Sequence, residues 1–326
     1  MKENDIRPQN IFQKFLSLSV DDIPTYFSNV ELLHQSRPAC GEQASPVFEK
    51  HGFAYERCPG CKTLFVNPRP VKSAFERYYT ESQSSKFWAD EFYRETALSR
   101  RALLWKPKAH QIKQLLDNYA TGYCSVIDIG GGFGLFAEAF NEIAGKLPQI
   151  IEPSPGLAAA CREKSLPVIE KFLEDVEELE LPSGQKCFVS FELIEHLPDP
   201  NTFLHKLKHL MKKEDLFIFT TLSGTGVDIL ALGENSKSVS PPHHLNFFNP
   251  WSIELLLTKL GFDCLQVTTP GKLDIDILCN NAALIKDPFW RTFLDLATEE
   301  HKSVWQHIIS ETKWSSHMMV VCRKGT

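Results

Sequence analysis

The sequence predicts an α/β protein built around a doubly wound sheet, with a small cap on its N-terminal side. Short apolar runs alternate with segments of helical spacing from residue 124 to the C-terminus, which is typical of βαβ units. A glycine-rich turn follows the first of these runs, and an acidic residue ends the second. Seven strands are expected, at residues 124–127, 149–152, 167–169, 187–191, 216–219, 262–268 and 317–322.

The glycine turn precedes a segment of helical spacing at residues 135–143. A strand, a glycine turn and a helix in this order place main-chain amides and a helix N-terminus around a ligand, and glycine allows close approach because it has no Cβ. A dinucleotide fingerprint requires glycine where this chain has Leu135, so the turn argues against an NAD dehydrogenase. The order found instead is Asp-x-Gly-x-Gly-x-Gly, formed by Asp128, Gly130, Gly132 and Gly134.

Glu152 ends the second strand, 24 residues after Asp128. A carboxylate at this place can accept hydrogen bonds from both hydroxyls of a ribose, a role shared with NAD sites. The alternative interpretation is a solvated acid at a strand end. Together, the turn and the acid predict a site for a nucleoside.

Composition excludes several classes of protein. With 326 residues, the chain can form one large domain or two modest ones and bury a substantial core. A net charge of −6 and a pI near 6.0 argue against nucleic-acid binding through bulk charge. No apolar run approaches the roughly 20 residues of a membrane span, and residues 1–5 lack a signal-peptide pattern. Nine scattered cysteines, an odd number, are expected to be mostly reduced and buried in a cytoplasmic protein.

Residues 37–82 contain a candidate metal site. Cys58-Pro-Gly-Cys61 is a Cys-x-x-Cys turn, and Cys40 resembles the second half of another such turn. A zinc ribbon needs four ligands in two paired turns, and Arg37 stands at the place of the missing cysteine. Either a structural zinc ion is bound, or the ribbon has lost its metal and is held by packing. Residues that can complete the tetrahedron in the first case are His34, Glu42 and His51.

Residues 84–120 are expected to be helical. Aromatic residues are dense just before and within the start of this segment, between 78 and 93, which favours packing of a cap onto the main domain over stacking with a substrate. The residues expected on the core side of the helices are Leu98, Leu103, Leu104, Ile112, Leu115 and Leu116.

Two of these features resemble a known family. The Asp-x-Gly-x-Gly-x-Gly turn is similar to the first motif of the class I S-adenosylmethionine-dependent methyltransferases. The Cys-x-x-Cys ribbon that runs into Phe-Val-Asn-Pro-Arg-Pro at residues 65–70 looks like the N-terminal module of bacterial members with small-molecule or sugar-nucleotide substrates, of which the sugar C-methyltransferases are the best-known branch. The resemblance covers roughly residues 37–326 and departs from the family at Arg37. It implies a Rossmann-like fold, S-adenosylmethionine as cofactor, and a last strand antiparallel beside the sixth.

The resemblance also implies which residues line the cofactor pocket. The loop after the third strand lies beside the adenine in this family, which points to Phe172 and Leu173. The end of the fourth strand faces the methyl donor, which points to Phe191 and Glu192.

The segment after the fourth strand matches the family's fourth motif. Its Glu192, Glu195 and His196 have i, i+3, i+4 spacing and share one face if the turn is helical. Some methyltransferases that act on hydroxyls hold a divalent cation with such a set. In the alternative, Glu195 and His196 form a hydrogen-bonded turn, and His196 remains a candidate general base.

Residues 222–249 are expected to form a lid loop at the rim where open α/β sheets bind ligands. The His-Leu-Asn-Phe-Phe segment that starts at His244 is a feature of the resembling family. His244 is therefore a second candidate for contact with the acceptor, as a base or as a fourth metal ligand. The alternative is a histidine that caps the next helix or bonds to the lid backbone.

The domain organisation predicted from these observations has four parts: an N-terminal helix and loop (1–36), a zinc-ribbon-like module (37–82), a helical linker (83–120), and a cofactor-binding domain (121–326) with the lid and a helical insertion at 287–313. The predicted function is methyl transfer from S-adenosylmethionine to a small molecule, a sugar nucleotide or a related precursor of a polysaccharide or secondary metabolite. Two alternatives are a metal-dependent O-methyltransferase that uses Glu192, Glu195 and His196, and a protein that binds the cofactor without turnover.

Overall fold

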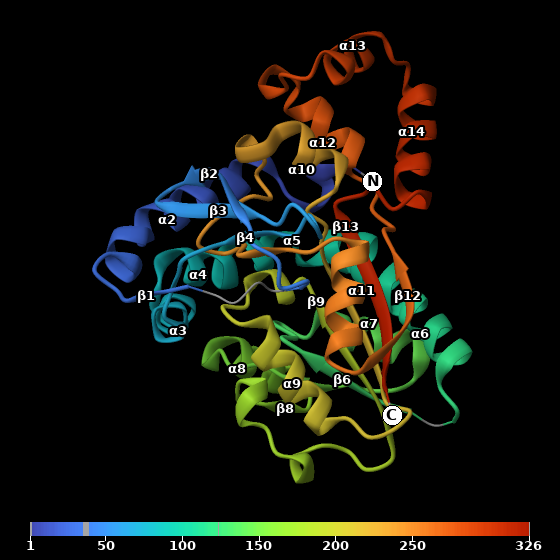
Figure 1. Ribbon diagram of the computed structural model, residues 1–326. Coiled ribbons are helices and arrows are strands. Elements are labelled where there is room, and N and C mark those ends of the chain that lie inside the picture. Colours follow the sequence, from blue (N-terminus) through green and yellow to red (C-terminus); the bar gives the residue numbers. More distant parts are fainter. Residues whose placement is uncertain (1, 35–38, 123, 326) are drawn as a thin grey trace.

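The fold was analysed in a computed structural model that describes residues 2–34, 39–122 and 124–325. Its centre is a seven-stranded sheet in the order β12-β13-β10-β9-β6-β7-β8 (Figure 1). All neighbouring pairs from β10 to β8 are parallel, whereas β13 is antiparallel to both β10 and β12. The predicted fold class and the antiparallel last strand are confirmed. The strands are β6 (Cys124–Ile129), β7 (Gln149–Ile151), β8 (Val168–Ile169), β9 (Gln185–Phe191), β10 (Leu216–Leu222), β12 (Phe262–Thr268) and β13 (His317–Lys324).

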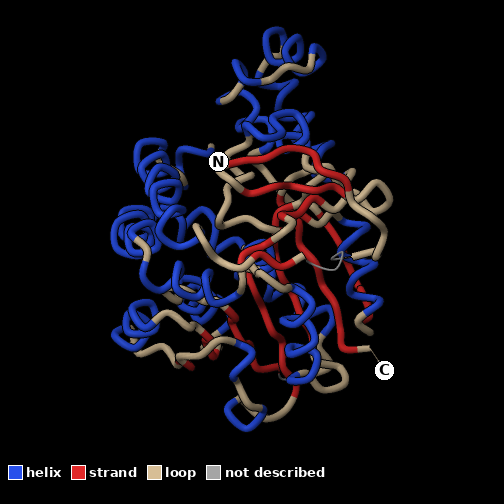
Figure 2. The backbone as a smooth tube through the Cα atoms, turned by 60° about the vertical axis from the view of Figure 1, so that its left-hand side comes forward, coloured by secondary structure: helices blue, strands red, loops and turns tan. Residues whose placement is uncertain are grey.

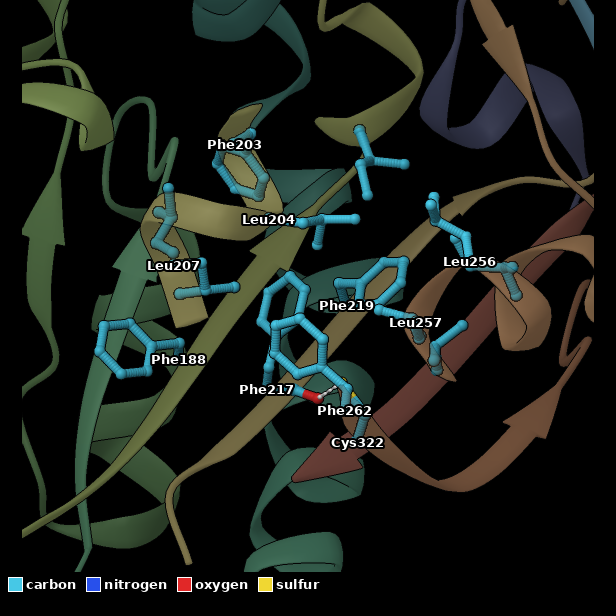
Figure 3. Close-up of a cluster of buried hydrophobic side chains, with 14 of the residues drawn as sticks. Phe188, Phe203, Leu204, Leu207, Phe217, Phe219, Leu256, Leu257, Phe262 and Cys322 are labelled. Carbon is cyan, nitrogen blue, oxygen red and sulfur yellow. Dashed lines mark hydrogen bonds between the residues drawn. The ribbon is translucent and has the colours of Figure 1, made fainter. Parts of the chain in front are cut away.

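Helices cover both faces of this sheet (Figure 2). Alternate strand residues point to opposite faces, so Ile127 packs toward α9 and α11, while Val126 packs toward α6 and α7. Figure 3 shows the first of these cores, in which Phe203, Leu204 and Leu207 of α9 meet the phenylalanines of β9 and β10. The helices of this domain are α6 (Lys106–Tyr119), α7 (Leu135–Ala144), α8 (Pro155–Glu163), α9 (Pro200–Leu210) and α11 (Pro250–Lys259).

A second sheet belongs to the N-terminal module, in the order β11-β4-β3-β2. Its fourth strand, β11 (Asn246–Phe247), comes from the segment expected to be a lid loop. This segment also contains α10 (Val227–Leu232), and its Leu245, Phe247 and Phe248 are fully buried. It is therefore a packed connection between module and catalytic domain. The module's other strands are β1 (Leu32–Leu33), β2 (Ser45–Lys50), β3 (Phe53–Arg57), β4 (Leu64–Val66) and β5 (Arg69–Pro70).

The N-terminal helices stack beside the seven-stranded sheet and lead into α6, the first helix that packs on it (Figure 1). Two π-helical turns, η1 (Trp88–Phe92) and η2 (Arg101–Trp105), interrupt the helical segment predicted for 84–120. They shift the helical phase, so Leu98 is 83% exposed and Leu103 41% exposed. The prediction that these two leucines face the core is wrong, whereas Ile112, Leu115 and Leu116 are buried as expected. The helices are α1 (Glu3–Ile6), α2 (Gln9–Phe27), α3 (Lys72–Glu81), α4 (Gln83–Phe87) and α5 (Tyr93–Arg100).

The predicted helical insertion is present as α13 (Pro288–Leu296) and α14 (Glu299–Glu311). Together with α10 and α12 (Asp274–Asn280) it forms a satellite core around Leu278 and Ile309, at one end of the molecule (Figure 1). None of the helices in the described ranges is long and apolar enough to span a bilayer.

We expect Gly134→Ala to lower the free energy of unfolding more than Gly145→Ala. Both glycines have left-handed φ angles, +70° and +63°, so both substitutions carry similar backbone strain. A Cβ at Gly134 collides with Leu166 Cδ1, whereas one at Gly145 meets nothing within 4 Å. Overpacking at Gly134 adds about 1–3 kcal/mol, measurable by urea denaturation. Equal losses in the two variants would contradict this account of the turn.

Candidate functional site

A cavity of about 1120 Å³ opens at the carboxyl ends of β6, β7, β9 and β10, the edge where parallel sheets bind ligands. The glycine turn lines it, α5 lies against that turn through the contact of Tyr93 with Phe133, and residues of α2 and α3 complete the N-terminal part of the lining. The predicted site residues that line it are Gly130, Gly132, Glu152, Phe172, Leu173, Phe191, Glu192, His196 and His244.

Glu152 lies beside the glycine turn with its carboxylate fixed by main-chain amides. Gly132 N donates to Oε2 and Ser154 N to Oε1, each at 2.9 Å. Burial raises the pKa of Glu152, and these two hydrogen bonds partly oppose the shift. The side chain is 5% exposed and reaches the cavity wall, so it is not a solvated acid at a strand end.

Asp128 and Gly134, also predicted to bind the cofactor, do not line the cavity. Asp128 lies beneath the turn at 1% exposure, and burial together with Glu152 raises its pKa to about 8. Gly134 begins α7 and packs closely on Leu166. These two residues therefore shape the turn from below.

Glu192 has a left-handed φ of +52° at the end of β9. Its Oε1 accepts from Thr220 Oγ1 at 2.7 Å and lies 3.2 Å from His317 Nδ1. Lys108 Nζ is 3.3 Å from His317 Nε2. Burial raises the pKa of Glu192, but the charges of His317 and Lys108 lower it by more than burial raises it. The pKa of Glu192 is therefore well below its usual range.

His317 and Lys108 were missed by sequence reasoning. His317 begins the last strand, and its register opposite Leu222 brings it to the same sheet edge as Glu192. That register was the only available signal. Burial lowers the pKa of Lys108 to about 8, and its ammonium lies 5.2 Å above the ring of Phe191.

Glu195, His196 and His244 form a compact group whose ligand atoms all lie within 4.8 Å of one another. Thr221 Oγ1 donates to Glu195 Oε2 at 2.8 Å, while the buried Oε1 has no hydrogen-bond partner among the described residues. His244 Nδ1 donates to Ser238 O at 2.6 Å, which leaves Nε2 free to accept a proton or a metal ion. Burial raises the pKa of Glu195, and the nearby Glu192 adds to that rise.

A buried arginine fixes the position of this group. Arg69, 1% exposed, donates to Val66 O at 2.7 Å, to Pro198 O at 2.9 Å and to Asn246 Oδ1 at 2.6 Å. Asn246 in turn donates to Leu197 O at 2.8 Å. The turn that carries His196 and the segment that carries His244 are thus tied to the N-terminal module.

Comparison with known proteins identifies the family. A sequence profile described as a methyltransferase domain matches residues 86–267, more than half of the chain. The chain belongs to this methyltransferase family. It is a class I methyltransferase that depends on S-adenosylmethionine, and the match includes the glycine turn, Glu152 and the segment with His196 and His244.

Solved structures similar to the methyltransferase are distant. A methyltransferase from Thermotoga maritima, titled a possible histamine N-methyltransferase, is 17% identical, with TM-score 0.44 over 72% of this chain and 95% of that chain. One from Archaeoglobus fulgidus is 18% identical, with TM-score 0.45 over 71% and 100% of the two chains. A plantazolicin methyltransferase with bound S-adenosylhomocysteine is 12% identical, with TM-score 0.49 over 77% and 94%. A search of curated proteins gave no match.

The three cysteines of the N-terminal module do not line the cavity. Cys40, Cys58 and Cys61 come together, with Cys40 Sγ 3.2 Å from Cys58 Sγ. Within the described ranges no fourth ligand joins these three, and the predicted position of the missing ligand, Arg37, lies outside them. Burial raises the pKa of Cys58 to about 11. Three sulfur ligands fit a structural zinc ion but do not complete its tetrahedron.

His243 lies next to His196 and His244 and is hydrogen-bonded. Its Nε2 is 3.0 Å from Ser19 Oγ and 2.8 Å from Tyr78 Oη. Burial and the neighbouring His244 lower its pKa from 6.5 to about 3. Burial likewise lowers the pKa of His244 to about 4 and that of His196 well below its ordinary value. All three imidazoles are therefore neutral at pH 7.

We expect the methyltransferase to lose stability as pH falls from 6.5 toward 4, with His243 as a contributor. A histidine whose folded pKa is depressed stabilises the protein above the unfolded pKa, and this contribution is lost as the unfolded chain takes up the proton. The loss for one such group approaches about 1.4 kcal/mol per pH unit. Urea denaturation at several pH values should show a shallower dependence in His243→Gln and an unchanged one in the exposed His205→Gln. An identical slope for wild type and His243→Gln would refute the assignment.

Proposed function

We propose that the enzyme methylates a small molecule, a sugar nucleotide or a related precursor of a polysaccharide or secondary metabolite. The observation that carries this proposal is the continuity of one cavity, which runs from the glycine turn to the histidine pair. A volume of about 1120 Å³ exceeds the usual range of a single-ligand pocket and accommodates a donor together with an acceptor.

The donor half of the cavity matches the chemistry of S-adenosylmethionine. The amides and bare backbone of Gly130 and Gly132 allow close approach of the ligand. Glu152 accepts hydrogen bonds from the ribose hydroxyls, and Phe172 and Leu173 contact the adenine. Phe191 and Glu192 border the methionine part at the end of β9; we assign Asp128 and Gly134 to support of the turn.

The acceptor half supplies a base. The methyl group passes in line from the sulfonium to the acceptor, the sulfur keeps the bonding electrons, and S-adenosylhomocysteine leaves. The acceptor's proton goes to His244 Nε2, whose tautomer is set by the bond from Nδ1 to Ser238 O. His196, which faces His244 with ring centroids 4.8 Å apart, is the alternative base.

Methyl transfer to a panel of sugar nucleotides from isotopically labelled S-adenosylmethionine, followed by mass spectrometry, tests the proposed substrate class. We expect a labelled product with the wild-type enzyme. Glu152→Ala should bind S-adenosylhomocysteine about 10- to 100-fold more weakly, because hydrogen bonds to a charged group contribute 1.5–3 kcal/mol. The exposed Glu163→Ala is the matched control. Donor binding without transfer to any sugar nucleotide would rule out this substrate class.

A metal-dependent O-methyltransferase is the second candidate, favoured by the group of Glu195, His196 and His244. Two imidazoles and one carboxylate form a set that suits divalent iron and similar first-row cations. These ligands differ from the set that the sequence suggested. Glu192 is engaged by Thr220 and His317, and His244 occupies the third ligand position instead. Such an ion supplies Lewis acidity toward an acceptor hydroxyl.

One experiment separates base from metal. In the first mechanism, His244→Ala lowers the transfer rate by about 10²- to 10⁴-fold with unchanged affinity for S-adenosylhomocysteine, and activity survives chelation. Exposed His209→Ala is the control. Activity that disappears on chelation and returns with Mn²⁺, together with a metal content that falls in Glu195→Gln, would establish the second mechanism instead.

We also propose that Cys40, Cys58 and Cys61 hold a structural zinc ion through their three thiolates. The three thiols within 4.8 Å of one another support this assignment. Metal analysis of Cys61→Ser and of Glu195→Gln against wild type distinguishes this zinc centre from a metal ion held by Glu195, His196 and His244. Cys61→Ser should remove only the zinc ion, and Glu195→Gln only the ion at the histidines.

A further inference from the structure

Two arginines face the cavity on the side of the glycine turn, and the methyl-transfer chemistry described above uses neither. Arg7 follows the short helix α1, and Arg100 ends α5. Because α1 packs against α5, the two side chains reach the same part of the cavity from neighbouring elements. Neither guanidinium forms an ion pair with a carboxylate anywhere in the described ranges.

The two guanidinium groups pack on aromatic rings and not on carboxylates. The guanidinium carbon of Arg100 lies 5.8 Å from the ring centroid of Phe92 and 5.3 Å from that of Tyr93. Its Nε is buried and has no hydrogen-bond partner among the residues described. Arg7 lies 5.5 Å from the ring centroid of Phe12. The aromatic contacts orient the two guanidinium groups. Among the described residues the Tyr93 side chain hydrogen-bonds to Arg100, and most of the N–H groups of the pair stay available to a ligand.

The acids nearest to Arg7 are already engaged by other residues. Glu192 is held by Thr220 and His317, and Glu3 accepts from Asn280 Nδ2 at 2.9 Å. Burial raises the pKa of Asp228 to about 7, so much of it is uncharged near neutral pH. Burial lowers the pKa of Arg7, and the charge of Arg100 lowers it further. Two like charges at a cavity wall without a counter-ion are unfavourable unless a ligand supplies one.

We propose that Arg7 and Arg100 together bind one oxyanion, a carboxylate or a phosphate group, of a ligand in this cavity. The inference rests on the proposed donor and acceptor sites. Two sources share this chemistry: the amino-acid carboxylate of the donor, and an anionic group of the acceptor. The first source is near, since Tyr93, which Arg100 covers, contacts Phe133 of the glycine turn with ring centroids 4.7 Å apart.

Calorimetry with three probes tests the proposal and distinguishes the sources. S-adenosylhomocysteine carries the carboxylate, 5′-methylthioadenosine keeps the nucleoside and lacks the amino acid, and inorganic pyrophosphate represents an acceptor anion in protein saturated with S-adenosylhomocysteine. We expect Arg7→Gln and Arg100→Gln each to weaken binding of one anionic probe by about 10- to 100-fold. Methylthioadenosine should bind all variants equally, which also shows that they are folded.

Weakened binding of S-adenosylhomocysteine assigns the site to the donor carboxylate, and weakened binding of pyrophosphate alone assigns it to the acceptor. Arg94→Gln, an exposed arginine on the same helix α5, should change neither. Unchanged affinity for both anionic probes in both variants, with methylthioadenosine still bound, would overturn the proposal. Failure of the wild-type enzyme to bind any adenosine probe would instead count against the donor site itself.

Discussion

The geometry of the site depends on one buried cation, Arg69. Its buried guanidinium donates hydrogen bonds to oxygens of three separate segments. These are the carbonyl of Val66 near its own strand, the carbonyl of Pro198 in the turn, and the side-chain amide of Asn246. Burial lowers its pKa to about 10, so the charge persists at neutral pH and every one of these bonds is charge-assisted. A buried charge with one bond missing is costly, so the three segments hold one arrangement and, with it, the relative positions of His196 and His244.

The two halves of the cavity differ in their polar groups: one presents a fixed carboxylate, and the other presents neutral imidazoles. On the donor side, Glu152 is fixed by two main-chain amides and therefore remains a directed acceptor at a strand end. In the part of the cavity proposed for the acceptor, the imidazoles of His196, His243 and His244 are neutral because burial lowers their pKa values. A neutral imidazole beside a sulfonium is useful, since an imidazolium would repel the donor and could not accept a proton. Desolvation, which makes these histidines weak bases in isolation, thus keeps them in the protonation state that the proposed role as a base requires.

Sequence reasoning found the elements whose signals are local. The sheet strands and the glycine turn follow from periodicity and from residue types at adjacent positions. It did not find β11, because this strand has two residues and exists only by pairing with β4, some 180 positions earlier. Likewise, His317 reaches Glu192 through the register of an antiparallel strand, and the π turns that expose Leu98 have no recognisable sequence mark.

The placement of the family match separates what is shared from what is particular to this enzyme. Residues 86–267 contain the glycine turn, Glu152, His196 and His244, to which the proposed donor and base roles are assigned. Part of the cavity lining comes from outside that range: α2 and α3 before it, and the residues that lead to His317 after it. With the donor placed at the strand ends as proposed, the acceptor lies toward these segments. On that proposal the N-terminal region and the last strand select the acceptor, and the same donor chemistry is compatible with many acceptors.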